Sequence, residues 1–76
     1  MAYNDSRNPL RALQRKLGDE IKVRLKDGTE YIGKLKEYDV YLNLIMESCK
    51  EIVNQVEGPV LNEVFIRGNN ILFVVP

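Results

Sequence analysis

The sequence predicts a small, strongly bent β-barrel of five strands, preceded by one α-helix. Three observations indicate this fold class: an apolar stripe at helical spacing near the start of the chain, strict alternation of apolar and polar residues after it, and turn signals at short intervals. One helix followed by short strands is typical of a small all-β barrel whose open end the helix covers. At 76 residues the chain is expected to form one domain, over residues 1–76.

A short amphipathic helix is predicted over about residues 9–17. Asn8-Pro9 is a helix-start signal, because Asn is a good N-cap and proline is favoured at the first helical position. Gly18 supplies a C-terminal stop. The apolar stripe of this helix consists of Leu10, Leu13 and Leu17.

The first two strands are predicted from a change of period after Asp19. Asp27-Gly28 predicts a tight two-residue hairpin turn, since glycine tolerates the positive φ of such a turn. The second strand, over residues 29–38, contains Gly33, and a glycine in mid-strand usually marks a bulge or a sharp bend. A bend there lets one long strand serve both sides of the barrel. Alternation in the first strand places three apolar residues on one face: Ile21, Val23 and Leu25.

Three further strands are expected over residues 42–52, 60–66 and 71–75. Gly58-Pro59 predicts a loop over residues 54–59 between the first two of them. Arg67-Gly68-Asn69-Asn70 separates the last two.

The last strand is apolar on both faces, although an edge strand of a lone barrel should present a polar outer face. Phe65 is likewise out of phase with its neighbours on the preceding strand. We interpret both features as burial against a neighbouring copy of the chain, which continues the sheet between subunits. The alternative is that the helix covers these residues. Oligomerisation would also supply stability that so short a chain lacks, since a single cysteine and no histidine leave no internal disulfide and no plausible zinc site.

The formal net charge is zero, which argues against a protein held to nucleic acid by bulk charge. Residues 1–36 carry nine Lys or Arg and five Asp or Glu, whereas residues 37–76 carry two and six. This asymmetry fits either a solvated surface of both signs or one cationic face.

Several classes of protein are not expected from this composition. The sequence has no run of about 18 apolar residues and no secretory h-region, so we expect a cytoplasmic protein rather than a membrane or secreted one. The absence of histidine, of a phosphate-binding glycine loop and of a Gly-x-Ser-x-Gly motif argues against an enzyme, and no cofactor or metal is expected. Cys49 is interpreted as a small buried residue rather than a thiol activated by Lys50.

Polar residues that the strand pattern does not explain gather in two loops, around residues 38–44 and 66–71. In the first loop Tyr41 offers a face for stacking a nucleobase, and the amide of Asn43 can both donate to and accept from a base edge. Asp39 is suited to orienting that amide, since a carboxylate would repel phosphate. In the second loop Arg67 can stack on a base or bond to it, and Gly68 leaves the backbone open to close approach. The alternative for each loop is ordinary turn chemistry.

These residues resemble the two motifs of the Sm and Sm-like (Lsm) proteins, most closely the short archaeal Sm-like proteins. The first motif is recognisable over about residues 21–47, with Asp39-x-Tyr41-Leu42-Asn43 in place of the family's Asp-x-aromatic-Met-Asn. The second is recognisable over about residues 64–75, with Arg67-Gly68-Asn69-Asn70. The resemblance covers about residues 9–76. It implies the Sm fold, a five-stranded, strongly bent antiparallel SH3-like barrel with an N-terminal helix.

The resemblance also implies a ring, most often of seven subunits and of six in bacterial relatives, in which the fourth strand of one subunit pairs with the fifth of the next. It implies an oligouridine site at the inner rim of the pore. There Tyr41 and Arg67 would sandwich the base, Asn43 would bond to its edge and Asp39 would brace Asn43. The remaining predicted site residues, which would shape the second loop, are Gly68 and Asn69.

We therefore predict a homo-oligomeric ring that binds single-stranded, U-rich RNA in RNA processing or metabolism, with a heptamer expected and a hexamer as the alternative. The competing hypothesis is a ring-forming scaffold for protein interactions that does not bind RNA. A second RNA contact is possible on the helix face, at Arg11 or Arg15.

Overall fold

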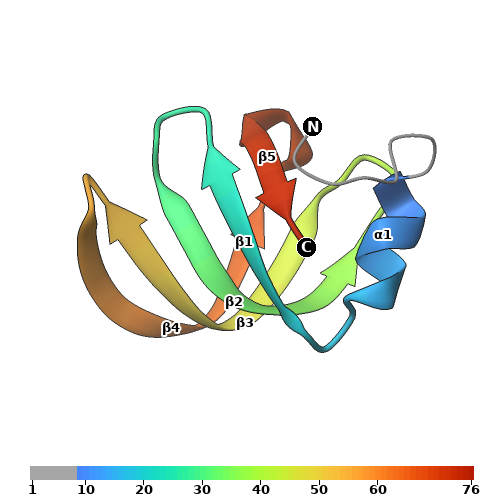
Figure 1. Ribbon diagram of the computed structural model, residues 1–76, viewed down its shortest axis with the longest axis horizontal. Coiled ribbons are helices and arrows are strands. Elements are labelled where there is room, and N and C mark those ends of the chain that lie inside the picture. Colours follow the sequence, from blue (N-terminus) through green and yellow to red (C-terminus); the bar gives the residue numbers. More distant parts are fainter. Residues whose placement is uncertain (1–8) are drawn as a thin grey trace.

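The computed structural model describes residues 9–76 of the chain. One helix precedes five strands that form a single antiparallel sheet in the order β4-β3-β2-β1-β5, and this confirms the predicted fold class (Figure 1). β4 and β5 are the two edge strands, so the curled sheet is not closed by hydrogen bonds within the described part of the chain. The elements are α1 (Pro9–Arg15), β1 (Glu20–Leu25), β2 (Glu30–Tyr38), β3 (Leu44–Val53), β4 (Val56–Ile66), a 3-10 turn (Gly68–Asn70) and β5 (Ile71–Val75).

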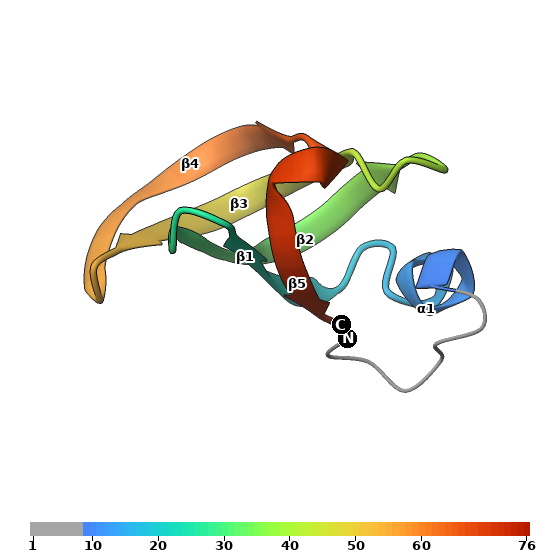
Figure 2. The same ribbon diagram turned by 90° about the horizontal axis from the view of Figure 1, so that it is seen from above.

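The core lies on the concave side of the sheet. Figures 1 and 2 both show α1 beyond one end of the sheet, where its apolar stripe contributes Leu13 to the core. The alternating residues of β1 point inward as predicted, with Ile21 and Val23 buried. Burial of these side chains is the main stabilising contribution that the chain itself supplies. The buried cluster consists of Leu13, Ile21, Val23, Leu35, Leu44, Met46, Cys49, Ile66 and Val74.

The sharp bend predicted at Gly33 is present and has a partner on the next strand. A Cβ atom on Gly33 would lie 2.7 Å from the Cα of Cys49, so only glycine allows β2 and β3 to approach this closely. Opposite it, Ser48 adopts a left-handed conformation with φ of 50°, and the β2–β3 register shifts between Ile32 and Lys34. A glycine on one strand and a bulge on the other together curl the sheet.

The end of the helix differs slightly from the prediction. α1 ends at Arg15 rather than near residue 17, and Leu17 instead forms a bridge with Leu35 of β2. Gly18 follows with φ of 83° and donates its N–H to the carbonyl of Leu35 at 2.8 Å. The predicted N-cap, Asn8, lies outside the described residues.

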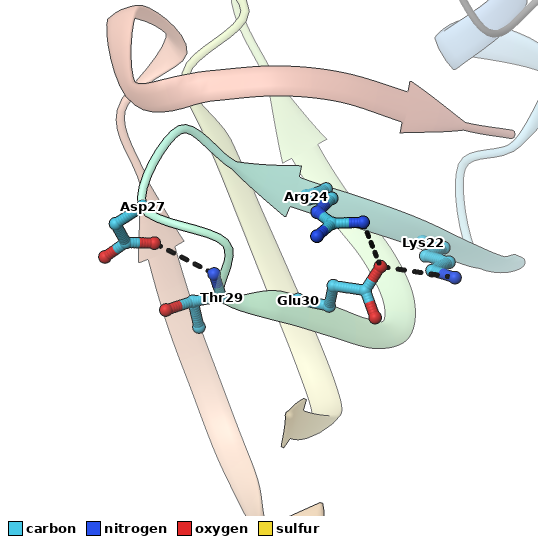
Figure 3. Close-up of polar contacts among 5 residues, drawn as sticks. All are labelled: Lys22, Arg24, Asp27, Thr29 and Glu30. Carbon is cyan, nitrogen blue, oxygen red and sulfur yellow. Dashed lines mark hydrogen bonds and ion pairs between the residues drawn. The ribbon is translucent and has the colours of Figure 1, made fainter. Parts of the chain in front are cut away.

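The β1–β2 turn is one residue longer than the predicted two. The N–H of Leu25 donates to the carbonyl of Thr29 at 2.8 Å, which leaves Lys26, Asp27 and Gly28 between them, with Gly28 at φ of 94°. The carboxylate of Asp27 accepts from the N–H of Thr29 at 2.9 Å (Figure 3). A three-residue loop with glycine in the left-handed position is a common alternative to the two-residue turn.

The prediction of a loop over residues 54–59 is wrong. β3 and β4 are joined by a tight turn at Asn54-Gln55, with φ of 51° and 66°, and β4 begins at Val56. Gly58-Pro59 therefore lies inside a strand. Proline is tolerated there because β4 is an edge strand and its register with β3 shifts nearby, between Lys50 and Ile52. β3 also begins at Leu44 rather than at residue 42, because a separate turn occupies residues 39–43.

Basic side chains on the outer face of the sheet lie close to carboxylates. Glu30 contacts both Lys22, at 3.3 Å, and Arg24, at 3.8 Å (Figure 3). Two further ion pairs, each at 2.9 Å, join Lys36 to Glu63 and Lys50 to Glu57. This face therefore carries both signs of charge. That arrangement fits a solvated surface of mixed charge, which was the first of the two interpretations of the charge asymmetry.

The helix does not cover the outward residues of the edge strands. Phe65 on β4 is 72% exposed and Leu72 on β5 is 58% exposed. The alternative in which α1 buries these residues is thereby excluded.

Within residues 9–76, no helix is long and apolar enough to cross a membrane.

Candidate nucleic-acid interface

The two polar loops that the sequence singled out meet in space. The side-chain oxygen of Asn43, in the β2–β3 turn, accepts a hydrogen bond from the backbone N–H of Gly68 at 2.8 Å. Gly68 opens the short 3-10 turn that joins β4 to β5. One amide thus holds together segments that are 25 residues apart.

Asp39 is the centre of the first loop. One carboxylate oxygen accepts from the N–H groups of Tyr41, at 2.8 Å, and Asn43, at 3.0 Å, while the other accepts from the Asn43 side-chain nitrogen at 2.9 Å. The bond from the Asn43 side chain is the largest cause that lowers the pKa of Asp39 below its usual value, and the two backbone N–H groups add to it. The brace between Asp39 and Asn43, expected from the resemblance, is present.

These contacts fix the orientation of the Asn43 amide. Rotating it by 180° would turn its nitrogen toward the N–H of Gly68 and its oxygen toward the carboxylate of Asp39, and both contacts would become repulsive. A primary amide has two N–H donors and two oxygen lone pairs. One of each is used within the protein, so one N–H and one lone pair remain for a ligand.

The loop backbone contains a strained residue that sequence reasoning missed. Leu42 has φ of 62°, a left-handed conformation that costs a branched side chain about 1–2 kcal/mol. The N–H of Leu42 donates to the carbonyl of Asp39 at 3.0 Å, and the three bonds to the Asp39 carboxylate hold the residues on either side. Asp39 two residues before Tyr41 is a sequence signal for such a side-chain-closed turn.

Gly68 is required by close approach rather than by an unusual backbone angle. A Cβ atom there would collide with the backbone carbonyl oxygen of Tyr41 and lie 3.0 Å from the carbonyl carbon of Leu42. The second loop can therefore sit against the first only because position 68 has no side chain.

The two predicted stacking residues face solvent. Tyr41 is 77% exposed, and Arg67 is also exposed and forms no ion pair with any residue that the structure describes. Asn69 is exposed within the 3-10 turn, and its side chain makes no hydrogen bond in the described region. Its predicted role in the site stays a prediction.

A hollow of about 440 Å³ adjoins this site on the outer face of the sheet. Its walls include a cross-strand row of Glu37, Ile45 and Phe65. Sequence reasoning did not associate this row with the site, although each member lies two residues along the chain from a predicted site residue. The lining residues are Glu37, Tyr38, Asp39, Asn43, Leu44, Ile45, Phe65, Ile66 and Arg67.

No three His, Cys, Asp or Glu side chains of residues 9–76 gather into a group that could hold a metal ion. Cys49 is fully buried, and burial raises the pKa of its thiol to about 11, in agreement with its interpretation as a small core residue.

A curled five-stranded sheet behind a short helix carries this site, and an asparagine amide joins its two polar loops. Residues 11–76 match the family model of the LSM domain, and the chain belongs to that family. It is 35% identical over 68 residues to a putative snRNP Sm-like protein of Thermoplasma acidophilum. The aligned segment covers 90% of this chain and 82% of that relative.

Solved structures of archaeal Sm proteins are also similar to this chain, both in fold and in sequence. The Sm protein of Pyrococcus abyssii in complex with a uridine heptamer has a TM-score of 0.84 and 32% identity, over 90% of this chain and 96% of that one. A heptameric archaeal Sm protein has a TM-score of 0.80 and 32% identity, over 87% and 96%. The resemblance to archaeal Sm-like proteins that the sequence motifs indicated is thus confirmed.

Proposed function

We propose that this protein is a non-enzymatic, homo-oligomeric ring that binds single-stranded, U-rich RNA and acts in RNA processing or metabolism. The observation that carries the proposal is the fixed amide of Asn43, which keeps one N–H and one lone pair free beside exposed Tyr41 and Arg67. The proposed RNA-binding residues are Asp39, Tyr41, Asn43, Arg67, Gly68 and Asn69.

The base is expected to lie between Tyr41 and Arg67. An aromatic ring and a planar guanidinium both stack on bases of any sequence, and the contact of a base with an aromatic ring is worth about 1–3 kcal/mol. Both side chains are exposed in the free protein, so a base can enter between them and complete the stack.

Preference for uracil follows from the order of the free groups on Asn43. The uracil edge presents a carbonyl oxygen next to an N–H, so the free amide N–H would donate to the first while the free lone pair accepts from the second. Cytosine presents the opposite order at these two positions. Since Asp39 and Gly68 prevent the amide from turning over, a base held in the same stack is discriminated by this order.

Assembly into a ring is supported by the two bare edges of the sheet. β4 and β5 have no strand on their outer sides, and both present exposed apolar side chains, including Phe65 and Leu72. Pairing β4 of one copy with β5 of the next would bury them and satisfy the edge hydrogen bonds. We propose seven subunits, as in the heptameric archaeal relative, with six as the alternative. Several weak pockets on one ring then bind one RNA strand together, because linked sites raise affinity through effective concentration.

Fluorescence polarisation with labelled oligouridine and oligoadenosine tests this function. We expect tighter binding of oligouridine, and loss of binding in Asn43→Ala and in Arg67→Ala. Asn62→Ala, which changes an exposed asparagine elsewhere on β4, is the matched control and should bind as the wild type does.

Equal binding of both oligonucleotides would reject the uridine preference. Unchanged binding by the Asn43 and Arg67 variants would reject the site, and a ring that binds neither oligonucleotide would leave the scaffold hypothesis in its place.

A further inference from the structure

The second loop of the proposed RNA site is short and closed by its own backbone. The N–H of Asn70 donates to the carbonyl of Arg67 at 3.0 Å, and the N–H of Ile71 donates to the carbonyl of Gly68. Bonds of this i to i+3 kind fix a single 3-10 turn, so its two ends move together. The position of Asn70 therefore influences the direction of the Gly68 N–H, which orients the amide of Asn43.

The far end of this turn is held by the hairpin between β1 and β2. The backbone N–H of Lys26 donates to the carbonyl of Asn70 at 2.9 Å. The preceding N–H, that of Leu25, points to the opposite side of the strand and donates to Thr29. The hairpin thus bonds to itself on one side and to the second loop on the other. That loop is held at both ends, by Asn43 at its first residue and by Lys26 at its last.

Two features fix the conformation of the hairpin turn. Gly28 has φ of 94°, and the carboxylate of Asp27 accepts from the N–H of Thr29 at 2.9 Å (Figure 3). The first is a left-handed conformation that disfavours a side chain, and the second is the closure that an aspartate provides in a turn. Both residues lie within two positions of Lys26, so they determine where its N–H points.

We propose that the β1–β2 hairpin positions the RNA site, with Asp27 and Gly28 holding the Lys26 N–H in place against the second loop. Through the 3-10 turn this bond keeps the Gly68 N–H directed at the amide of Asn43. The inference rests on the proposed function, and Asp27 and Gly28 are positioning residues because they act through the loop. A loosened hairpin should leave the amide less firmly oriented, so that uracil is bound less tightly and is less well distinguished from cytosine.

Two alanine substitutions separate positioning from stability. Gly28→Ala and Gly18→Ala each add a side chain to a left-handed backbone, at φ of 94° and 83°, and at neither position would the added Cβ meet an atom beyond its chain neighbours within 4 Å. Both should lower the thermal midpoint similarly. Gly18 lies between α1 and β1, away from the hairpin turn, and is the matched control.

Only Gly28→Ala should alter the RNA site. We expect roughly fivefold weaker oligouridine binding and a smaller ratio of oligouridine to oligocytidine affinity, both measured by fluorescence polarisation. Hydrogen exchange of residues 67–70, measured by mass spectrometry without RNA, should also be faster in Gly28→Ala and unchanged in Gly18→Ala.

A second pair of variants leaves the backbone unstrained. Asp27→Ala and Asp27→Asn remove the same negative charge, but asparagine keeps a side-chain oxygen that can accept from the N–H of Thr29. Asp27→Ala should therefore lose uracil preference in the same direction as Gly28→Ala, whereas Asp27→Asn should retain it.

Equal loss of uracil preference in the two glycine variants, or in the two Asp27 variants, overturns the positioning role, as does unchanged preference in Gly28→Ala. A wild type that does not prefer oligouridine overturns the proposed function instead. Hydrogen exchange, which needs no RNA, then decides the positioning by itself: faster exchange of residues 67–70 in Gly28→Ala alone supports it, and equal exchange in both glycine variants overturns it.

Discussion

The side-chain oxygen of Asn43 accepts a hydrogen bond from the backbone N–H of Gly68, and this 2.8 Å contact joins the turn after β2 to the turn after β4. In the proposed RNA site, both loops are therefore needed. The first loop supplies the oriented amide and Tyr41, and the second supplies the N–H that completes the orientation together with Arg67.

Gly68→Ala should separate the two loops. The added Cβ would collide with the carbonyl oxygen of Tyr41, which is backbone and cannot rotate away. We expect oligouridine affinity to fall by more than about tenfold and the free energy of unfolding to fall by about 1–3 kcal/mol, as for other overpacked positions. Polarisation and chemical denaturation measure the two effects. Asn69→Ala in the same 3-10 turn is the control for stability, and wild-type binding by Gly68→Ala would contradict the contact.

Oligouridine binding should be independent of pH between about pH 5 and pH 8 and should weaken at lower pH. The sequence has no histidine, and hydrogen bonds to Asn43 and Tyr41 lower the pKa of Asp39 from its model-compound value of 3.8. Since the folded pKa lies below the unfolded one, the stabilising contribution of the ionised carboxylate is present above the unfolded pKa and is lost as the pH falls through the folded pKa. A protonated Asp39 can no longer accept all three bonds.

Polarisation titrations from pH 8 to pH 3 measure this dependence, with circular dichroism to follow folding. Asp39→Asn should bind more weakly at neutral pH and should lose the acid-dependent step. A step near pH 6.5 in the wild type, or an unchanged acid step in Asp39→Asn, would contradict the assignment.

Arg67→Lys should weaken binding although it keeps the positive charge. Lysine lacks the planar guanidinium that stacks on a base, so we expect roughly a tenfold loss of affinity, which is about 1.4 kcal/mol. The dependence of affinity on salt concentration should be shallow in the wild type, unchanged in Arg67→Lys and shallower still in Arg67→Gln. If Arg67→Lys binds as the wild type does, Arg67 acts through charge alone and the sandwich is wrong.

Gln55→Gly should stabilise the protein. Asn54 and Gln55 both have positive φ in the β3–β4 turn, and Asn-Gly is the preferred pair for such a turn. Removing the side chain of Gln55 relieves about 1 kcal/mol of backbone strain, which thermal unfolding would show as a higher midpoint. Gln55→Ala keeps the Cβ atom and serves as control; equal stabilisation by both variants would exclude backbone strain as the cause.

Sequence reasoning predicted the sheet well where the signal was local. Alternation at Ile21 and Val23 assigned the buried face of β1, and Gly33 marked the bend. It failed at Gly58-Pro59, because those residues are turn formers in isolation. Their place in an edge strand follows from the tight turn at Asn54-Gln55, which carries no glycine to announce it.

For the candidate site, the sequence alone predicted which side chains are involved and that they lie in two loops between strands. It also indicated the brace between Asp39 and Asn43, because the motif places them four residues apart in one turn. Only the tertiary structure decided that Gly68 completes the orientation of the amide, that Leu42 is left-handed, and that Phe65 continues the site into a hollow. Periodicity reports which face of a strand a residue occupies, whereas contacts between distant loops depend on how far the sheet curls, and that curl arises where Gly33 and Ser48 meet across two strands.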